Sequence, residues 1–168
     1  GTQPLLQPAV LLSSDPQQRG LLPLSASAGA GAEGVRAVDV VFPLLHGTYG
    51  EDGTVQGLLE LADIPYVGAG VLGSAVGMDK GVMKVLLQSA GLPVVPHLVV
   101  RRLDWEQDPV AVHTQILRAL SLPLFVKPAN LGSSVGVSKV KQVEELPAAV
   151  ELACQYDRRL LIEQGLDC

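Results

Sequence analysis

The chain has 168 residues, of which 48% are hydrophobic and 17% are charged, so it can bury a core of its own and is not a disordered chain. Its formal net charge of −5 and the absence of any run of Lys and Arg argue against nucleic-acid binding. No apolar run reaches the roughly 18 residues of a membrane-spanning helix, so no membrane span is predicted.

Two cysteines and the first residues of the chain indicate a compartment. Cys154 and Cys168 are too few for a disulfide framework, and Cys154 falls on the apolar side of a predicted helix, where an unpaired buried thiol is expected. The opening residues contain two early prolines and no basic segment, which is unlike a signal peptide. We therefore predict a protein of the reducing cytoplasm.

The chain begins with a segment that carries little structural signal. Residues 1–34 are rich in Pro, Gln, Ser, Gly and Ala, and 25–34 are expected to form a surface loop. We expect this segment to be a variable connector without a function of its own.

A strand, a helix and a second strand are predicted next. The run 35–45 is apolar on both faces, which is typical of a central strand of a parallel sheet. Apolar residues of 54–64 recur at helical spacing, with Asp52 or Thr54 available as the N-terminal cap. Because 65–70 predicts a short strand closed by glycines, the three segments form a βαβ unit.

The middle of the chain predicts two helices around a strand. A helix is expected over 73–91, ending at a glycine, and a strand over 92–100. Two prolines confine this strand to an edge or make it start late. The next helix, 108–120, has Asp108 as its cap and Pro109 at its first helical position.

The last part of the chain predicts strands at 122–128 and 135–140, a helix at 143–157 and a final strand at 160–166. Only a short loop joins the first two strands. They therefore form a hairpin inside an α+β domain, which differs from a doubly wound sheet.

The loop of this hairpin is the first candidate site. Lys127 ends an apolar strand, Pro128 stops the strand, and the next residues place Gly132 and Gly136 around two serines. Glycines permit close backbone approach, so successive N–H groups can point at one anion beside the lysine. The spacing is not that of a Walker loop, and a simple structural turn is the commoner meaning of such a hairpin.

Four further side chains stand out from their surroundings. Glu163 lies on an apolar strand, as a charge at the rim or as an acceptor for a polar ligand. Lys80 begins a helix after a glycine-rich turn, whereas Lys84, one turn later, is expected on a solvated face. His46 ends a predicted buried strand, where α/β proteins place ligand-contacting groups. No cluster with metal-ligand spacing is found in the sequence.

Four segments resemble the D-alanine–D-alanine ligases of the ATP-grasp superfamily, in order and spacing from about residue 38 to residue 166. The motifs HGxxGEDGxxQG and KPxxxGSSVG are specific to that family and its D-alanine–D-lactate relatives, while residues 1–37 show no convincing match. The segments are LLHGTYGEDGTVQGLLELADIPYVGAG (44–70), GMDKGVMKVLLQSAGLPVVP (77–96), LPLFVKPANLGSSVGVSKV (122–140) and LLIEQGL (160–166).

The resemblance implies that ATP lies between two α+β domains, with the Gly/Ser loop folded over its phosphates. Lys80 and Lys127 would contact the phosphates, and Lys127 would also lie close to the adenine. Ser133, the catalytic residue that the resemblance implies, would help hold the active site closed. Ser134 falls where backbone N–H groups of the loop meet the phosphates.

The same resemblance assigns the adenine and the first substrate. Glu163 would receive the adenine amino group, with the backbone around Gln164 and Leu166 completing that contact. His46 falls where the first D-alanine is held, with Glu51 beside it. The family often has an aromatic residue at the position of Gly165, which implies a looser adenine pocket here.

The implied fold is α/β with an α+β central part. Residues 1–68 would be part of the N-terminal parallel-sheet domain that binds substrate, 69–162 the central ATP-grasp domain, and 163–168 the start of the C-terminal ATP-grasp domain. Family members are longer, so we expect the chain to be an interior piece. The ligands for Mg²⁺ or Mn²⁺ are expected outside it.

The implied reaction joins two molecules of D-alanine for peptidoglycan precursor synthesis. The carboxylate of one D-alanine attacks the γ-phosphate of ATP, and the amine of the second attacks the resulting acyl phosphate. ATP and Mg²⁺ (or Mn²⁺) are the implied cofactors, and a homodimer is the implied assembly, with neither nucleic acid nor membrane as a partner.

Three alternatives remain open from the sequence. A D-alanine–D-lactate ligase would share these motifs. A nucleotide-binding module that has lost catalysis would also keep the loop. In the third, the Gly/Ser loop is only a turn in a soluble α/β domain.

Overall fold

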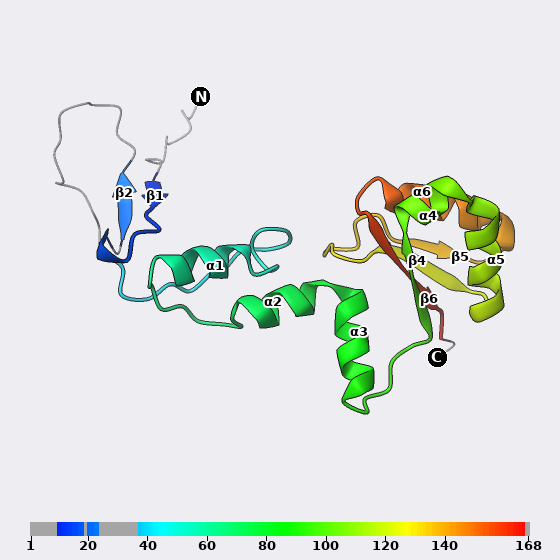
Figure 1. Cartoon of the computed structure of the whole chain (residues 1–168), viewed down its shortest axis with the longest axis horizontal. Helices are drawn as coiled ribbons and strands as arrows, with labels where there is room; N and C mark the ends of the chain where they lie inside the picture. The colour runs from blue at the N-terminus through cyan, green and yellow to red at the C-terminus, as the bar shows by residue number, and fades with distance from the viewer. Residues whose placement is uncertain (1–9, 19, 24–36, 167–168) are drawn as a thin grey trace, which may run out of the picture. The chain divides into compact units, whose positions relative to one another are not determined.

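The computed structural model describes residues 10–18, 20–23 and 37–166 of the chain. The chain divides into two compact units, Gly1–Leu72 (unit 1) and Gly73–Cys168 (unit 2) (Figure 1). The predicted surface loop 25–34 lies outside the described residues.

Unit 1 has little regular structure among its described residues. Strands β1 (Val10–Leu12) and β2 (Leu21–Pro23) pair antiparallel, with the 3-10 helix η1 (Pro16–Gln18) between them. Helix α1 (Thr54–Leu61) confirms the helix predicted over 54–64. Its buried residue Leu59 packs with two residues beyond the helix, Ala62 and Ile64, in a small core.

The central parallel strand predicted over 35–45 is not formed. Among the described residues of this run, only Val41 pairs, through a parallel bridge to Tyr66, and the strand predicted over 65–70 is reduced to the same bridge. The bonds join Val41 N–H to Pro65 O and Val67 N–H to Val41 O, both at 2.9 Å. A run apolar on both faces needs partners on both sides, and here Phe42 and Leu44 are 64% and 74% exposed.

Both predicted caps of α1 are wrong. The N-cap is Gly53, in a left-handed conformation with φ 92° and without a side-chain cap. Asp52 lies one position earlier, where its carboxylate accepts from Thr54 N–H at 3.0 Å. The carboxylate therefore shapes the turn before the helix.

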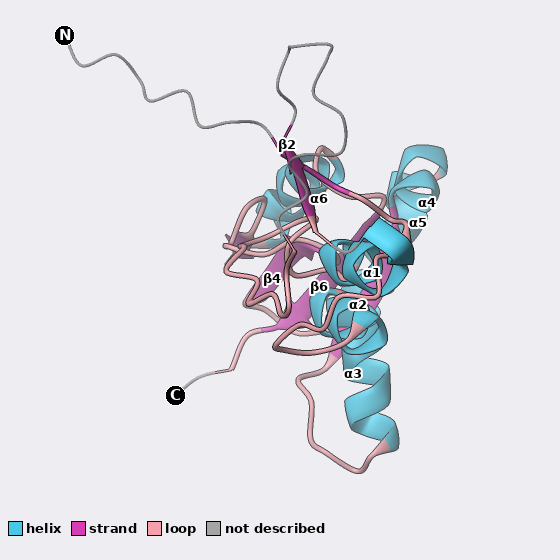
Figure 2. Ribbon diagram, turned by 90° about the vertical axis from the view of Figure 1, so that its left-hand side faces the viewer, coloured by secondary structure: helices cyan, strands magenta, loops and turns pink. Residues whose placement is uncertain are grey.

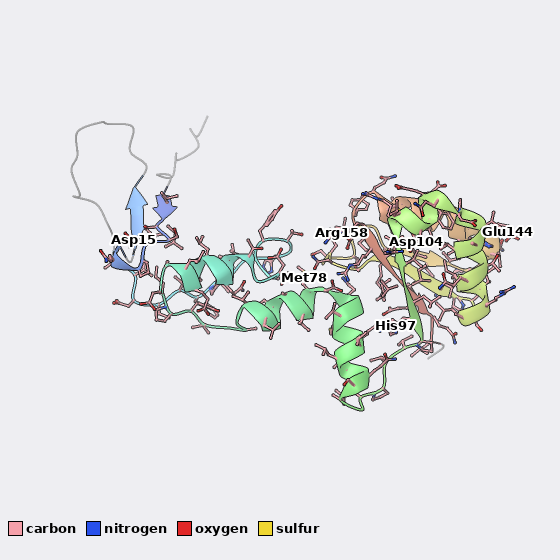
Figure 3. The ribbon with its side chains drawn as sticks, in the orientation of Figure 1. Asp15, Met78, His97, Asp104, Glu144 and Arg158 are labelled. Carbon is pink, nitrogen blue, oxygen red and sulfur yellow. The ribbon has the colours of Figure 1, made fainter. Side chains whose placement is uncertain are left out.

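The helix predicted over 73–91 is two helices, α2 (Val71–Met78) and α3 (Lys80–Ser89). Figure 3 labels Met78 at the end of α2, where the chain turns into α3. Asp79 breaks the helix, because its extended backbone (ψ 97°) lets its carboxylate accept from Val82 N–H and cap α3. Its carboxylate also pairs with Arg159.

Four antiparallel strands form the sheet of unit 2, in the order β3-β6-β4-β5. Strands β4 and β6 lie side by side at its centre, as Figures 1 and 2 both show. The predicted β4–β5 hairpin is confirmed. The strands are β3 (His97–Arg101), β4 (Leu124–Pro128), β5 (Ser138–Val140) and β6 (Arg159–Gln164).

Helices cover one face of this sheet. Two were predicted, α5 (Pro109–Ala119), capped by Asp108, and α6 (Leu146–Cys154), which follows the 3-10 helix η2 (Val143–Glu145). The short helix α4 (Arg102–Gln107) was not predicted. The apolar sides of α4, α5 and α6 form a continuous buried core with alternate residues of the strands, including Leu124, Val126, Leu160 and Ile162. Cys154 packs at the edge of this core, and burial raises the pKa of its thiol.

Candidate functional site

The opposite face of the unit 2 sheet carries the charged candidates. Side chains alternate along a strand, so burial of Leu124 and Val126 turns Phe125 and Lys127 to the other face. Glu163 pairs directly with Phe125 across the two strands, and directly opposed residues share a face. Lys127 and Glu163 therefore meet there and form an ion pair.

Helix α3 packs against this second face. A Cβ atom at Gly81 would lie 3.0 Å from Val99 Cγ2 of β3, so glycine permits the close approach. One turn later, Lys84 Nζ lies 2.7 Å from Glu163 Oε1, and its side chain is only 10% exposed. The solvated face expected for Lys84 is wrong, because Gly81 and Lys84 form the buried side of α3.

Glu163 is thus paired through both carboxylate oxygens, with Lys84 on one and Lys127 on the other. Burial of the carboxyl group favours its neutral form, but the two ammonium groups prevail and hold the pKa of Glu163 below its ordinary value of 4.5. Glu163 is therefore an ionised acceptor on a largely apolar strand.

Lys80 connects α3 to the glycine-rich loop. Its backbone N–H donates to Ala129 O at 2.9 Å, and its ammonium donates to the carbonyl of Leu131. Burial and the nearby Lys127 ammonium lower the pKa of Lys80 below its ordinary 10.5, against the attraction of Asp157 and Glu163. A half-buried cation held at the base of a loop is suited to binding an anion.

The loop itself adopts left-handed conformations at its serines. Ser133 and Ser134 have φ of 55° and 58°, Gly136 has φ of 69°, and both serines are exposed. Such backbone is strained for serine, and strain of this kind is concentrated at ligand-binding loops. A Cβ atom at Gly136 would lie 2.7 Å from Tyr156 Cδ2 and 2.9 Å from Pro128 Cγ, so glycine is required there.

The end of β6 turns away through a tight backbone contact. Gln164 N–H donates to Pro96 O at 3.0 Å, and its side-chain oxygen accepts from Ser121 N–H. A Cβ atom at Gly165 would lie 2.8 Å from Pro123 Cγ. An aromatic side chain at this position therefore requires Pro123 to move. Leu166 is exposed.

The candidates of unit 1 lie on a loop before α1. Glu51 folds back so that its Oε2 accepts from Gly47 N–H at 2.6 Å, next to the exposed His46. Asp52 accepts from Tyr49 N–H at 2.9 Å, and Tyr49 has φ of 68°. Burial opposes ionisation of Asp52, yet the backbone N–H groups of Tyr49 and Thr54, which donate to its carboxylate, lower its pKa. The loop is held by its own carboxylates.

Gln56 of α1 holds the same loop through a hydrogen bond. It is a buried residue of α1, and its amide nitrogen donates to Gly50 O at 3.4 Å. Its side-chain oxygen has no hydrogen-bond partner among the described residues.

The structure thus joins Lys80, Lys127 and Glu163 in unit 2, beside the loop of Ser133 and Ser134. Sequence reasoning missed Lys84 and Asp79. The available signal for Lys84 was its spacing, three residues after a glycine that lets the helix approach a sheet. In the described part of the chain, no group of three or more His, Cys, Asp or Glu side chains could hold a metal ion, and no helix could cross a membrane.

Two family models match the chain, and together they cover most of it. "D-ala D-ala ligase N-terminus" matches residues 13–69, and "D-ala D-ala ligase C-terminus" matches residues 86–168. The first match begins at residue 13, so the expectation that residues 1–37 show no convincing match to the family is wrong for residues 13–37.

Curated relatives agree with these matches. A D-alanine–D-alanine ligase of Pseudarthrobacter chlorophenolicus is 60% identical over 129 residues, 77% of this chain and 34% of the relative. D-alanine–D-alanine ligase A of Bradyrhizobium diazoefficiens is 51% identical over 161 residues, 95% of this chain and 42% of the relative. The chain therefore spans less than half of the length of these relatives.

Solved structures share the fold. The VanG D-Ala:D-Ser ligase of Enterococcus faecalis aligns with a TM-score of 0.82 at 38% identity, over 95% of this chain and 43% of that one. The D-alanine–D-alanine ligase of Coxiella burnetii aligns with a TM-score of 0.72 at 41% identity, over 79% of this chain and 39% of that one. The predicted ATP-grasp fold class is confirmed, and the chain belongs to the D-alanine–D-alanine ligase family.

Proposed function

We propose that the protein containing this chain is an ATP-dependent D-alanine–D-alanine ligase for peptidoglycan precursor synthesis. The observation that carries the proposal is the cluster of Lys80, Lys127 and Glu163 on one face of the unit 2 sheet, beside the loop of Ser133 and Ser134. The two lysines of this cluster are cations that can bind a triphosphate, and Glu163 is an ionised group that can accept a hydrogen bond from an amine. Both lie in a chain of this family.

In the proposed reaction, one D-alanine carboxylate oxygen bonds to the γ-phosphorus of ATP as the bond to the β-phosphate oxygen breaks, which releases ADP. The amine of the second D-alanine then bonds to the acyl carbon. Phosphate leaves and the amine loses a proton. Neither step requires a protein nucleophile, so positioning and electrostatic stabilisation carry the acceleration.

The residues of this chain divide these tasks. Lys80 and Lys127 bind the phosphates, and backbone N–H groups around Ser134 add donors to the same oxygens. Ser133 helps to keep the loop closed over the reactants. Such contacts exclude water, which would otherwise hydrolyse an acyl phosphate.

Adenine and the first substrate take the remaining positions. Glu163 accepts from the adenine amine, with the backbone of Gln164 and Leu166 alongside. In unit 1, His46 and Glu51 hold the first D-alanine. The hydrogen bond from Gly47 N–H to Glu51 supports a fixed geometry for that loop.

The proposed enzyme uses Mg²⁺ or Mn²⁺ with ATP, but the described residues do not form a site for either ion. We also propose that the protein is a cytoplasmic homodimer.

Another acceptor is the second candidate. One structural relative, with a TM-score of 0.82, is a D-Ala:D-Ser ligase, and D-lactate is the acceptor of the first alternative that the sequence motifs leave open. D-serine and D-lactate each place an amine or hydroxyl group where the second D-alanine would present its amine. A non-catalytic nucleotide-binding module is the remaining alternative.

Phosphate release from ATP and Mg²⁺ by the full-length protein tests the proposal. Release is expected with D-alanine but not with L-alanine, and D-serine and D-lactate form separate arms of the same assay. Faster release with either of these would support the second candidate. ATP binding without release in any arm would support the non-catalytic module.

A change at Lys127 tests the phosphate contact. Lys127→Ala is expected to weaken ATP binding by about tenfold or more, because it removes a charge-assisted bond from a partly buried site. Lys141→Ala is the matched control, since Lys141 is an exposed lysine after β5. Equal ATP affinity of the two variants, measured by calorimetry, would contradict the assignment.

A further inference from the structure

Lys84 is the most buried of the three lysines around Glu163. Its side chain is 10% exposed, against 21% for Lys127, and its ammonium lies 2.7 Å from Glu163 Oε1. Lys80 points instead to the carbonyl of Leu131 at the base of the loop. Of these three lysines, Lys84 is therefore the one most deeply buried against Glu163. It is also the one for which no contact with the phosphates is proposed.

We propose that Lys84 is the positioning residue that makes the nucleotide site select 6-amino purines over 6-oxo purines, by keeping Glu163 ionised and fixed. This inference rests on the proposed function, because it needs Glu163 to face the purine. It adds a specificity role for a residue that contacts no nucleotide itself.

The first step of the argument concerns the protonation state. An ionised carboxylate only accepts hydrogen bonds, so it accepts from an exocyclic amine and repels a carbonyl oxygen. A protonated carboxyl group can donate, and it then accommodates a carbonyl oxygen. Selectivity for the amine therefore depends on an ionised Glu163.

The second step concerns which cation remains. Lys127 pairs with Glu163 here, yet its proposed partners in the nucleotide complex are the phosphates. When Lys127 turns to them, its hold on Glu163 weakens. Lys84 is fixed on a buried helix face behind the carboxylate, so it remains as the near counter-charge.

The other charged groups around Glu163 do not replace Lys84. His97 lies directly opposite Glu163 on β3, but its ring Nδ1 lies 3.0 Å from Val95 O. Lys139 of β5 lies over the ring of Phe125, 5.5 Å from its centroid. Lys80 attracts Glu163 from a greater distance, through charge alone. Removing Lys84 thus leaves a largely buried carboxylate without its permanent partner.

The test compares ATP with ITP, which carries a carbonyl oxygen where ATP carries the amine. Calorimetry measures the affinity of the full-length protein for each nucleotide at several pH values, without D-alanine. Both nucleotides carry the same triphosphate, so titration of the phosphates cancels in the ratio of affinities. The variant is Lys84→Met, which removes the charge and keeps an unbranched chain of similar length.

The native protein is expected to prefer ATP by a ratio that stays constant between about pH 6 and about pH 8. In Lys84→Met the preference is expected to fall by about tenfold or more at the acid end of this range, since losing an opposite charge raises a carboxyl pKa by roughly 1–3 units. Lys84→Arg keeps the charge and is expected to restore the native ratio. Lys141→Met is the control for loss of a lysine.

Several outcomes separate the inference from the proposed function. A native protein that binds neither nucleotide would overturn the proposed function. A native protein that binds ATP and ITP equally would overturn the inference, as would a folded Lys84→Met variant with the native ratio at every pH. If Lys84→Met does not fold, Lys84→Gln is measured in its place, because its neutral amide still offers a donor to Glu163.

Discussion

Glu163 shows how one residue can hold a site together at the smallest scale. Its carboxylate meets two ammonium groups, and most of its side chain is removed from water. Pairs of this kind add little net stability, because desolvation offsets much of the attraction, but removing one partner is costly. The arrangement therefore sets the charge state and orientation of the carboxylate more than it strengthens the fold.

The lowered pKa of Glu163 predicts a pH dependence of stability. A carboxyl group whose folded pKa lies below its unfolded value of 4.5 contributes stability that is complete above 4.5 and is lost as pH falls through the folded pKa. Glu163→Gln removes this contribution. The free energy of unfolding, measured with urea, should thus differ most between the native protein and Glu163→Gln above pH 4.5 and should converge as pH falls.

Glu106→Gln is the control for that measurement. Glu106 is 60% exposed and pairs with Arg102 at 3.6 Å, a surface pair of little energetic weight. A gap between the native protein and Glu163→Gln that stays constant into the acid range would contradict the prediction.

At the scale of elements, the break between α2 and α3 determines where Lys80 and Lys84 point. If α2 and α3 were one continuous helix, the axis of α2 would set the direction of the segment that carries both lysines. Asp79 ends α2, caps α3 and pairs with Arg159 at the start of β6, so α3 begins in a fixed position on the sheet. Gly81 then allows the helix to lie close to Val99 of β3.

Asp79→Ala is expected to destabilise unit 2 by about 2 kcal/mol or more, because it removes both a helix cap and the partner of Arg159. Asp108→Ala is the matched control. Asp108 caps α5 through Ala111 N–H at 2.9 Å, and the loss of a cap alone costs about 1 kcal/mol. Urea unfolding of the two variants checks the order, and an equal loss would show that the ion pair with Arg159 contributes nothing.

At the scale of the whole molecule, the chain divides the proposed tasks between its two units. Every residue proposed to contact ATP belongs to Gly73–Cys168, and both residues proposed for the first D-alanine belong to Gly1–Leu72. Unit 2 has a continuous core under a four-stranded sheet, whereas the described part of unit 1 has a core of only a few residues.

Hydrogen exchange should therefore separate the two ligands. ATP is expected to slow exchange of backbone amides in α3, β4 and β6, because binding adds to the free energy of opening these elements by about 2.7 kcal/mol at a hundredfold excess over Kd. D-alanine alone is expected to protect the segment 46–57. Protection of 46–57 by ATP in the absence of D-alanine, with none in β6, would contradict this division.

Sequence alone was sufficient where local signals agreed with the tertiary contacts. Asp108 followed by Pro109 predicted the start of α5, and that cap is present. The apolar run before Lys127 predicted β4, and its short connection to the next strand predicted an antiparallel hairpin. These features depend on neighbouring residues, so periodicity and turn residues determine them.

Two of the predictions that failed depended on distant partners. An apolar run predicts a central strand only if strands flank it, and the run around Val41 has a single bridge. A lysine on a helix is usually solvated, but Lys84 meets a carboxylate 79 residues further along the chain. No pattern within α3 itself could reveal that partner.

By itself, the sequence determined the family, the Gly/Ser loop, most of the helices and strands of unit 2 and most of the charged candidates, because motifs and periodicity are local properties. Only the tertiary structure decided which lysines meet Glu163, where Asp79 splits the helix and which loop residues take left-handed backbone. The physical reason is that burial and ion pairing depend on contacts across strands and helices, which the order of residues along one segment does not contain.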